Sequence, residues 1–289
     1  MAEQLKDIRN RVRSVKSTKQ ITKTMELVAT SKMKRAQERV AAAAPYNDKL
    51  QELLSEIAAK GSSFNDPLLT EREKVKRVNV LLICANRGLC GGYNANSIKL
   101  AKGLVDQQIA DGREVDFDIV GKKGISTLKF QGYELKRTYI DISDKPSLAD
   151  AQKIVAPMRE AFLKGETDEV HVVWTHWVSV GRQDTSSFRL LPITPPKNED
   201  KPKSGDMILD PSPEELLSSL LPMYLTQSIY TCLVEANASE QVARRTAMKS
   251  ATDNAEEMIT NLTRRLNRAR QAKITQEIAE VVGGAAALE

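Results

Sequence analysis

One heptad register runs through the first sixty residues and constrains the fold more than any other feature of the sequence. From Ile8 to Ile57 the seam positions recur in alternating steps of four and three, the pattern of a coiled coil. At 1.5 Å per residue this segment predicts a helix roughly 85 Å long. Pro45 should bend the helix or remove one hydrogen bond, and Gly61 is a suitable stop after Lys60. Such a helix cannot bury its apolar stripe alone, so the chain must supply a partner for it.

A second long helix is predicted near the other end of the chain. Ser212, Pro213 and Glu215 form a helix-start pattern, and no Gly follows until Gly283. The later part of this segment again alternates steps of three and four, and both stripes are rich in Ala, which lets two helices approach closely. We therefore expect an antiparallel coiled coil. The expected seam residues are Val12, Val15, Ala29, Met33, Ala36, Met258, Leu262 and Ala269.

The period changes between the two helices. The stretches VNVLLICA, FDIVG and VHVVWTHWVSV are apolar strands, and helical stretches separate them. Strands that alternate with helices predict a small α/β domain with a largely parallel sheet. The expected organisation is an N-terminal helix over 1–61, an α/β domain over 75–205 and a C-terminal helix over 212–289.

The N-terminal register contains one polar interruption. Lys19, Thr22 and Glu26 occupy seam positions, while the apolar residues of this stretch lie one position round the helix. These displaced residues are Ile21, Met25 and Val28. Two interpretations stay open on periodicity alone: a local stutter in the coil, or a surface that contacts a second partner.

The sequence offers little material for catalysis. The loop CANRGLCGGYN matches neither the Walker pattern nor GxGxxG, and it reads as a tight turn between a strand and a helix. His171 and His176 lie five residues apart on a predicted strand, so they face opposite sides and cannot share a metal ion. We expect no catalytic residue, no bound metal and no cofactor. The three Cys show no pairing pattern, which favours free thiols.

Positive charge gathers at both ends of the chain. Residues 1–40 carry a net charge of +7 and residues 240–273 a net charge of +4, against +5 for the whole chain. If the two ends pair, part of the rod is basic. Its partner is then solvent, an acidic protein or nucleic acid, although the low aromatic content (4%) argues against nucleic acid. No apolar run is long enough to span a bilayer.

Four sequence blocks resemble the gamma subunit of rotary ATP synthases of the bacterial type. The C-terminal block ITQEIAEVVGGA, from Ile274 to Ala285, is similar to the signature of that family. The blocks SVKSTKQITKTMELVATSKMKRAQ, NRGLCGGYN and NASEQVARRTAMKSATDNA are similar to its other recurrent blocks. The resemblance extends over the whole chain.

This resemblance implies a fold, a role and a set of partners. The fold is an antiparallel coiled coil with a small Rossmann-like domain between its helices. The role is that of a non-catalytic central-stalk rotor, which couples proton-driven rotation to the catalytic cycle of three beta subunits. The implied partners are three alpha and three beta subunits, the epsilon subunit and the membrane c-ring, with no nucleic acid and no membrane span. The implied location is the cytoplasmic side of a bacterial cell membrane. The alternative hypothesis is a basic coiled-coil protein that binds nucleic acid or acts as a scaffold.

The resemblance also implies residue roles. A polar contact with the beta subunit is expected at a single level of the rod, and the apolar tail should turn in a collar at the top of the ring or fray. The residues matched to the beta contact are Lys23, Met25, Arg244, Arg270, Gln271, Thr275 and Glu277. Those matched to the rotor-ring and epsilon contact are Ile208, Leu209 and Asp210.

Overall fold

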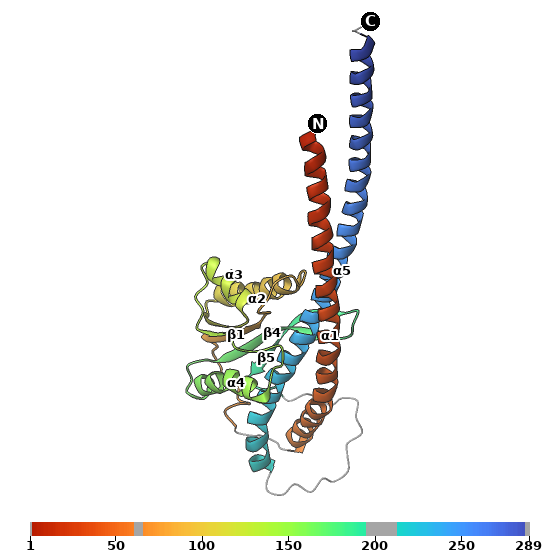
Figure 1. Ribbon diagram of the computed structural model, residues 1–289. Coiled ribbons are helices and arrows are strands. Elements are labelled where there is room, and N and C mark those ends of the chain that lie inside the picture. The colour runs from red at the N-terminus through yellow and green to blue at the C-terminus, as the bar shows by residue number, and fades with distance from the viewer. Residues whose placement is uncertain (1, 61–65, 195–212, 287–289) are drawn as a thin grey trace. The chain divides into compact units, whose positions relative to one another are not determined.

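The computed structural model describes residues 2–60, 66–194 and 213–286, which form two compact units. The first unit comprises Met1–Thr30 with Arg244–Glu289, and the second comprises Ser31–Ala243. Two long helices contribute to both units: α1 (Ala2–Lys60) and α5 (Pro213–Ala286). Figure 1 shows α1 in red to orange and α5 in cyan to blue. The boundary between the two units therefore falls within each long helix. The predicted segments 1–61 and 212–289 instead treated each long helix as a whole.

The second unit is built on a five-stranded sheet with the order β3-β2-β1-β4-β5. Its parallel strands are β1 (Arg77–Ile83), β2 (Glu114–Val120), β3 (Arg137–Tyr139) and β4 (Glu169–Trp177), and β5 (Gln183–Leu191) runs antiparallel at one edge. Six of the seven residues of β1 are buried, because the sheet is covered on both faces. The predicted α/β class with a largely parallel sheet is confirmed.

Different helices cover the two faces of the sheet. On one face, α2 (Tyr93–Ala110) and α3 (Lys122–Phe130) pack on Val78, Val80 and Leu82 of β1. On the other face, α4 (Leu148–Leu163) packs on Leu81 and Ile83, together with parts of α1 and α5 (Figure 1). The long helices thus complete the core of the α/β domain, because Leu54 of α1 and Leu221 of α5 are both buried in it.

The start of α4 is fixed by a capping box. The Ser147 hydroxyl accepts a hydrogen bond from the Asp150 backbone N–H (3.2 Å), and the Asp150 carboxylate accepts one from the Ser147 backbone N–H (2.8 Å). These bonds satisfy two of the amide groups that a helix start leaves unpaired. The helix then continues through Pro157.

The burial of α1 follows the heptad register of the sequence from Ile8 to Ile57. Every seam position in this range is buried or half-buried, including the polar Lys19, Thr22 and Glu26. The register has no stutter, because polar side chains hold it where apolar ones are missing. The helix also continues through Pro45 and ends at Lys60.

Candidate functional site

The candidate site is the helix pair of the first unit, formed by α1 up to Thr30 and by the part of α5 from Arg244 onward. Two contacts fix how the helices pair. The Thr252 hydroxyl donates to the Thr22 hydroxyl (2.8 Å), and Lys19 Nζ forms an ion pair with Glu256 Oε1 (2.8 Å). Residue numbers rise along one helix as they fall along the other, so the pair is antiparallel.

The polar stretch of the seam is satisfied by these same contacts. Thr22 and Thr252 are both buried, and the Thr22 hydroxyl also lies 3.0 Å from the Lys19 carbonyl oxygen, to which it donates. The hydrogen bond from Lys19 lowers the pKa of the Glu256 carboxyl below its ordinary value. A polar layer inside a coiled coil specifies register at some expense in stability. Lys19 and Thr22 of this interruption therefore fix the pairing of the two helices. The Glu26 carboxylate pairs with Lys23 of its own helix.

Apolar side chains of the same stretch point away from the seam. Ile21 is 58% exposed, Leu27 60% and Val28 51%, whereas Met25 is half-buried. Ile21 and Val28 are displaced from the seam as the sequence indicates, and they form an apolar strip on one side of α1. Leu27 faces another side of the helix, and Met25 is displaced only in part. Lys23 lies in the same stretch, exposed, and forms an ion pair with Glu26 (3.1 Å).

The seam of α5 differs in part from the prediction. Met258 is 52% exposed, so its assignment to the seam is wrong, and the neighbouring Ile259 is the half-buried residue. Met258 is apolar and fits alternating steps of three and four, but it lies one residue before the position that faces inward. The buried positions in fact step from Met248 to Thr252 and Ala255, because Thr252 faces Thr22.

The other predicted seam residues lie on inward positions. Val12, Val15, Leu262 and Ala269 are half-buried, and Ala29 is buried. Met33 and Ala36 belong to the second unit, where they are half-buried and buried, respectively.

The residues matched to the beta contact do not lie at one level of the rod. Thr22 faces Thr252, so Lys23 lies level with residue 251. Arg270 is 19 residues farther along α5, or about 28 Å at 1.5 Å per residue. The expectation of a single level is therefore wrong, because the antiparallel register separates the N-terminal block from the C-terminal block. Arg244, at the other end of this part of α5, is buried (8% exposed).

The C-terminal members of this set lie on an exposed part of α5. Arg270, Gln271, Thr275 and Glu277 are all exposed. The Thr275 hydroxyl donates to the Gln271 carbonyl oxygen (3.0 Å), and Lys273 forms an ion pair with Glu277 (3.3 Å). The described α5 continues beyond the first residue of α1 (Figure 1). It exposes a second apolar strip there, made of Ile274, Ile278, Val281 and Val282.

Three predicted residues cannot be placed. Ile208, Leu209 and Asp210 lie outside the described residues, so the expected rotor-ring contact stays a prediction.

The second unit contains a polar cluster that sequence reasoning did not identify. The Glu235 carboxylate of α5 accepts a hydrogen bond from Trp174 Nε1 (2.8 Å) and lies 2.8 Å from His176 Nδ1, both on β4. His171 contacts a different carboxylate, that of Glu169 (2.9 Å). The cluster ties α5 to the sheet. No sequence signal indicates it, because its members are about sixty positions apart and meet only through the fold.

Within the described residues, metal-binding side chains and thiols form no further functional site. Within them, no group of three His, Cys, Asp or Glu side chains is placed to hold a metal ion. Cys84, Cys90 and Cys232 are all buried. Burial raises the pKa of the Cys84 and Cys232 thiols, so both are protonated at neutral pH. A search of the described helices finds none long and apolar enough to cross a membrane.

Comparison with known proteins gives matches over the whole chain. The profile of the ATP synthase family matches residues 4–288. The ATP synthase gamma chain of Frankia casuarinae is 42% identical over 295 residues, covering 100% of this chain and 99% of the relative. The ATP synthase gamma chain of Heliobacterium modesticaldum is 45% identical over 291 residues, and the match covers 98% of this chain and 99% of the relative.

Solved structures share the fold. A chain of the Euglena gracilis mitochondrial ATP synthase rotor, in rotational state 1, aligns with a TM-score of 0.70 at 18% identity and covers 95% of this chain and 100% of that one. A chain of the central stalk and c-ring of Tetrahymena thermophila mitochondrial ATP synthase aligns with a TM-score of 0.58 at 23% identity. This alignment covers 80% of this chain and 99% of that one. At these identities the similarity concerns the fold.

Proposed function

This chain belongs to the ATP synthase gamma chain family, and from that premise we propose that it is the central-stalk rotor subunit of a proton-translocating ATP synthase. The observation that carries the proposal is the 42–45% identity to gamma chains over nearly the full length of both sequences. In this role the chain catalyses nothing itself. It rotates inside a ring of three alpha and three beta subunits and couples ion flow to ATP synthesis or hydrolysis at the beta subunits.

The physical requirement of such a rotor is asymmetry. A partner that contacts all conformations of the beta subunit equally cannot shift the balance between them. The helix pair of the first unit has different surfaces on its different sides: the apolar strip of Ile21 and Val28 on α1, and the end of the described α5 that extends beyond the described α1. As the pair turns, each beta subunit would meet these surfaces in sequence, so its preferred conformation would change with the angle of the rotor.

We assign the beta contact to two levels of the helix pair. The lower level contains Lys23 and Met25 beside the apolar strip of α1, and the upper level contains Arg270, Gln271, Thr275 and Glu277 on α5. Lys23 and Arg270 are exposed cations that would pair with beta carboxylates. Arg244 is buried, so we assign it a role in positioning the helices.

The remaining partners follow from the family role. We propose that the chain contacts the epsilon subunit and the c-ring through the segment that contains Ile208, Leu209 and Asp210, and that it is peripheral to the cytoplasmic side of a bacterial cell membrane. The rival hypothesis of a nucleic-acid-binding or scaffold protein has no support among the relatives described above.

The proposal is tested by reconstitution with alpha and beta subunits of a bacterial ATP synthase. We expect the unaltered chain to co-purify with them as one complex. Lys23→Glu and Arg270→Glu should each leave assembly intact but lower ATP turnover or its coupling to proton transport, because each places a like charge opposite a carboxylate. The two effects should be roughly additive, since the sites are far apart.

The matched control is Lys129→Glu, an equal charge reversal on the exposed surface of α3. It should leave turnover and coupling unchanged. Failure of the unaltered chain to assemble with alpha and beta subunits would refute the rotor role. Full coupling in the double variant would refute only the assigned contact residues.

A further inference from the structure

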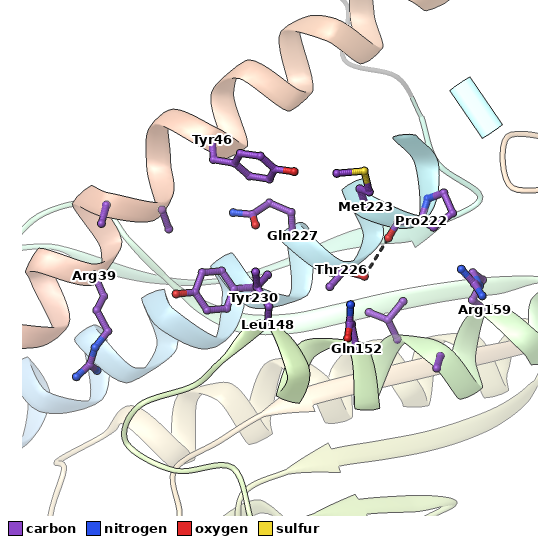
Figure 2. A pocket seen from close by; sticks show the side chains of 14 residues that line it. Arg39, Tyr46, Leu148, Gln152, Arg159, Pro222, Met223, Thr226, Gln227 and Tyr230 are labelled. Carbon is purple, nitrogen blue, oxygen red and sulfur yellow. Dashed lines mark hydrogen bonds between the residues drawn. The ribbon is translucent and has the colours of Figure 1, made fainter. Parts of the chain in front are cut away.

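A groove in the second unit is not explained by the proposed rotor role. It lies between α1, α4 and α5 and has a volume of about 690 Å³. Figure 2 shows its walls, with Tyr46 on α1, Leu148 and Gln152 on α4, and Met223 and Tyr230 on α5. Volumes of 300–1,000 Å³ are typical of sites for small organic ligands.

The groove is lined mainly by apolar side chains that remain in contact with solvent. Three large ones, Tyr46, Leu148 and Met223, are each about half exposed and all border it. Small side chains, including Ala43 and Ala156, keep the space between the helices open. A concentration of exposed apolar side chains around one hollow is characteristic of a binding surface.

The charge of the groove has one sign. Among the fourteen described residues that line it, the charged ones are Arg39 and Arg159, and none is acidic. Arg39 Nη1 donates to the Asp144 backbone carbonyl oxygen (2.9 Å). Arg159 is half-buried and makes no ion pair with any residue that the structure describes. It lies at the end of the groove near Pro222 (Figure 2).

We propose that this groove binds a single-chain amphiphile with an anionic head group, namely a long-chain carboxylate. The head group pairs with the Arg159 guanidinium, a planar donor whose geometry matches a carboxylate. The hydrocarbon chain lies along the apolar walls between Ala43 and Val155, where it covers the exposed surfaces of Tyr46, Leu148 and Met223. This inference does not rest on the rotor role.

The test measures binding of dodecanoate to the full-length chain by isothermal titration calorimetry, below the micellar concentration. Dodecyltrimethylammonium, with the same tail and the opposite charge, is the comparison ligand and should bind at least tenfold more weakly. In the series from octanoate to dodecanoate, affinity should rise by up to about fourfold per added methylene while the groove still has room.

Two variants separate the head-group contact from the cavity. Arg159→Gln should weaken dodecanoate binding about tenfold, the loss expected for one charge-assisted contact. Its control is Lys153→Gln on the same helix, since Lys153 pairs with Asp141 outside the groove. Ala156→Phe should abolish binding by filling the groove, and its control is Ala95→Phe, at an exposed position of α2. Circular dichroism should show that all four variants remain folded.

Equal binding of the anionic and cationic amphiphiles would overturn the proposal, as would equal effects of Arg159→Gln and Lys153→Gln. If dodecanoate does not bind, but Ala156→Phe weakens co-purification with alpha, beta and epsilon subunits, the groove is a protein interface and the proposal is wrong. That result would leave the rotor role intact.

Discussion

At the scale of single residues, the pairing of the two long helices depends on a hydroxyl contact where a coiled coil usually places apolar side chains. Thr22 and Thr252 are buried and joined by a 2.8 Å hydrogen bond. Each also lies within hydrogen-bonding distance of a carbonyl oxygen of its own helix, that of Lys19 for Thr22 and that of Met248 for Thr252. A shift of either helix by one residue would separate the two hydroxyls and also the Lys19–Glu256 ion pair. The contact therefore selects one register.

A double-mutant cycle tests this contact. We expect Thr22→Val and Thr252→Val each to destabilise the helix pair by about 0.5–1 kcal/mol, the net value of one hydrogen bond. The double variant should lose less than the sum, because no hydroxyl then faces an apolar partner. Hydrogen exchange in peptides covering residues 15–30 and 245–260 reports the local stability.

The control for the cycle is Thr260→Val. The Thr260 hydroxyl is exposed and bonds only within its own helix, to the Glu256 carbonyl oxygen (3.1 Å). This substitution should change exchange little. Strict additivity of the two buried substitutions would show that Thr22 and Thr252 do not act as a pair.

At the scale of elements, the turn from β2 into α3 depends on a glycine that no other residue can replace without strain. Gly121 has φ +101°, and a Cβ atom on it would lie 2.2 Å from the Cys84 carbonyl oxygen. The close approach exists because β1 and β2 are adjacent parallel strands, and the Cys84 N–H donates to the Val120 carbonyl oxygen (2.9 Å). Gly121 thus serves the close packing of β1 and β2.

Two glycine substitutions separate the cost of the backbone conformation from the cost of the clash with Cys84. Gly121→Ala combines an unfavourable φ with a backbone clash, so we expect a loss of about 3–4 kcal/mol in unfolding free energy. Gly112→Ala has a similar φ of +77° but nothing within 4 Å of the new Cβ, so it should cost about 1 kcal/mol. Urea denaturation followed by tryptophan fluorescence reports both. Equal losses would mean that the approach to Cys84 does not constrain this turn.

At the scale of the whole molecule, local patterns predicted the elements well and long-range relations poorly. The seam of α1 follows from a heptad period that is visible in any short window, and it matches the observed burial from Ile8 to Ile57. The separation of Lys23 and Arg270 along the helix pair depends on which residue of α5 faces Thr22. No short window of the sequence contains that information. The same reason explains why Met258 was misplaced and why the contact of Glu235 with Trp174 and His176 was not foreseen.

The rotor role also belongs to this scale, and observing rotation tests it most directly. A probe can be attached at Phe130→Cys, because Phe130 is 93% exposed while the native thiols are buried and the pKa of the Cys84 thiol is raised by burial. The labelled chain is assembled with alpha and beta subunits, and the ring is fixed to a surface. We predict that the probe turns in one direction while ATP is hydrolysed and stops when ATP is removed. A complex that hydrolyses ATP at full rate while the probe stays still would contradict the account.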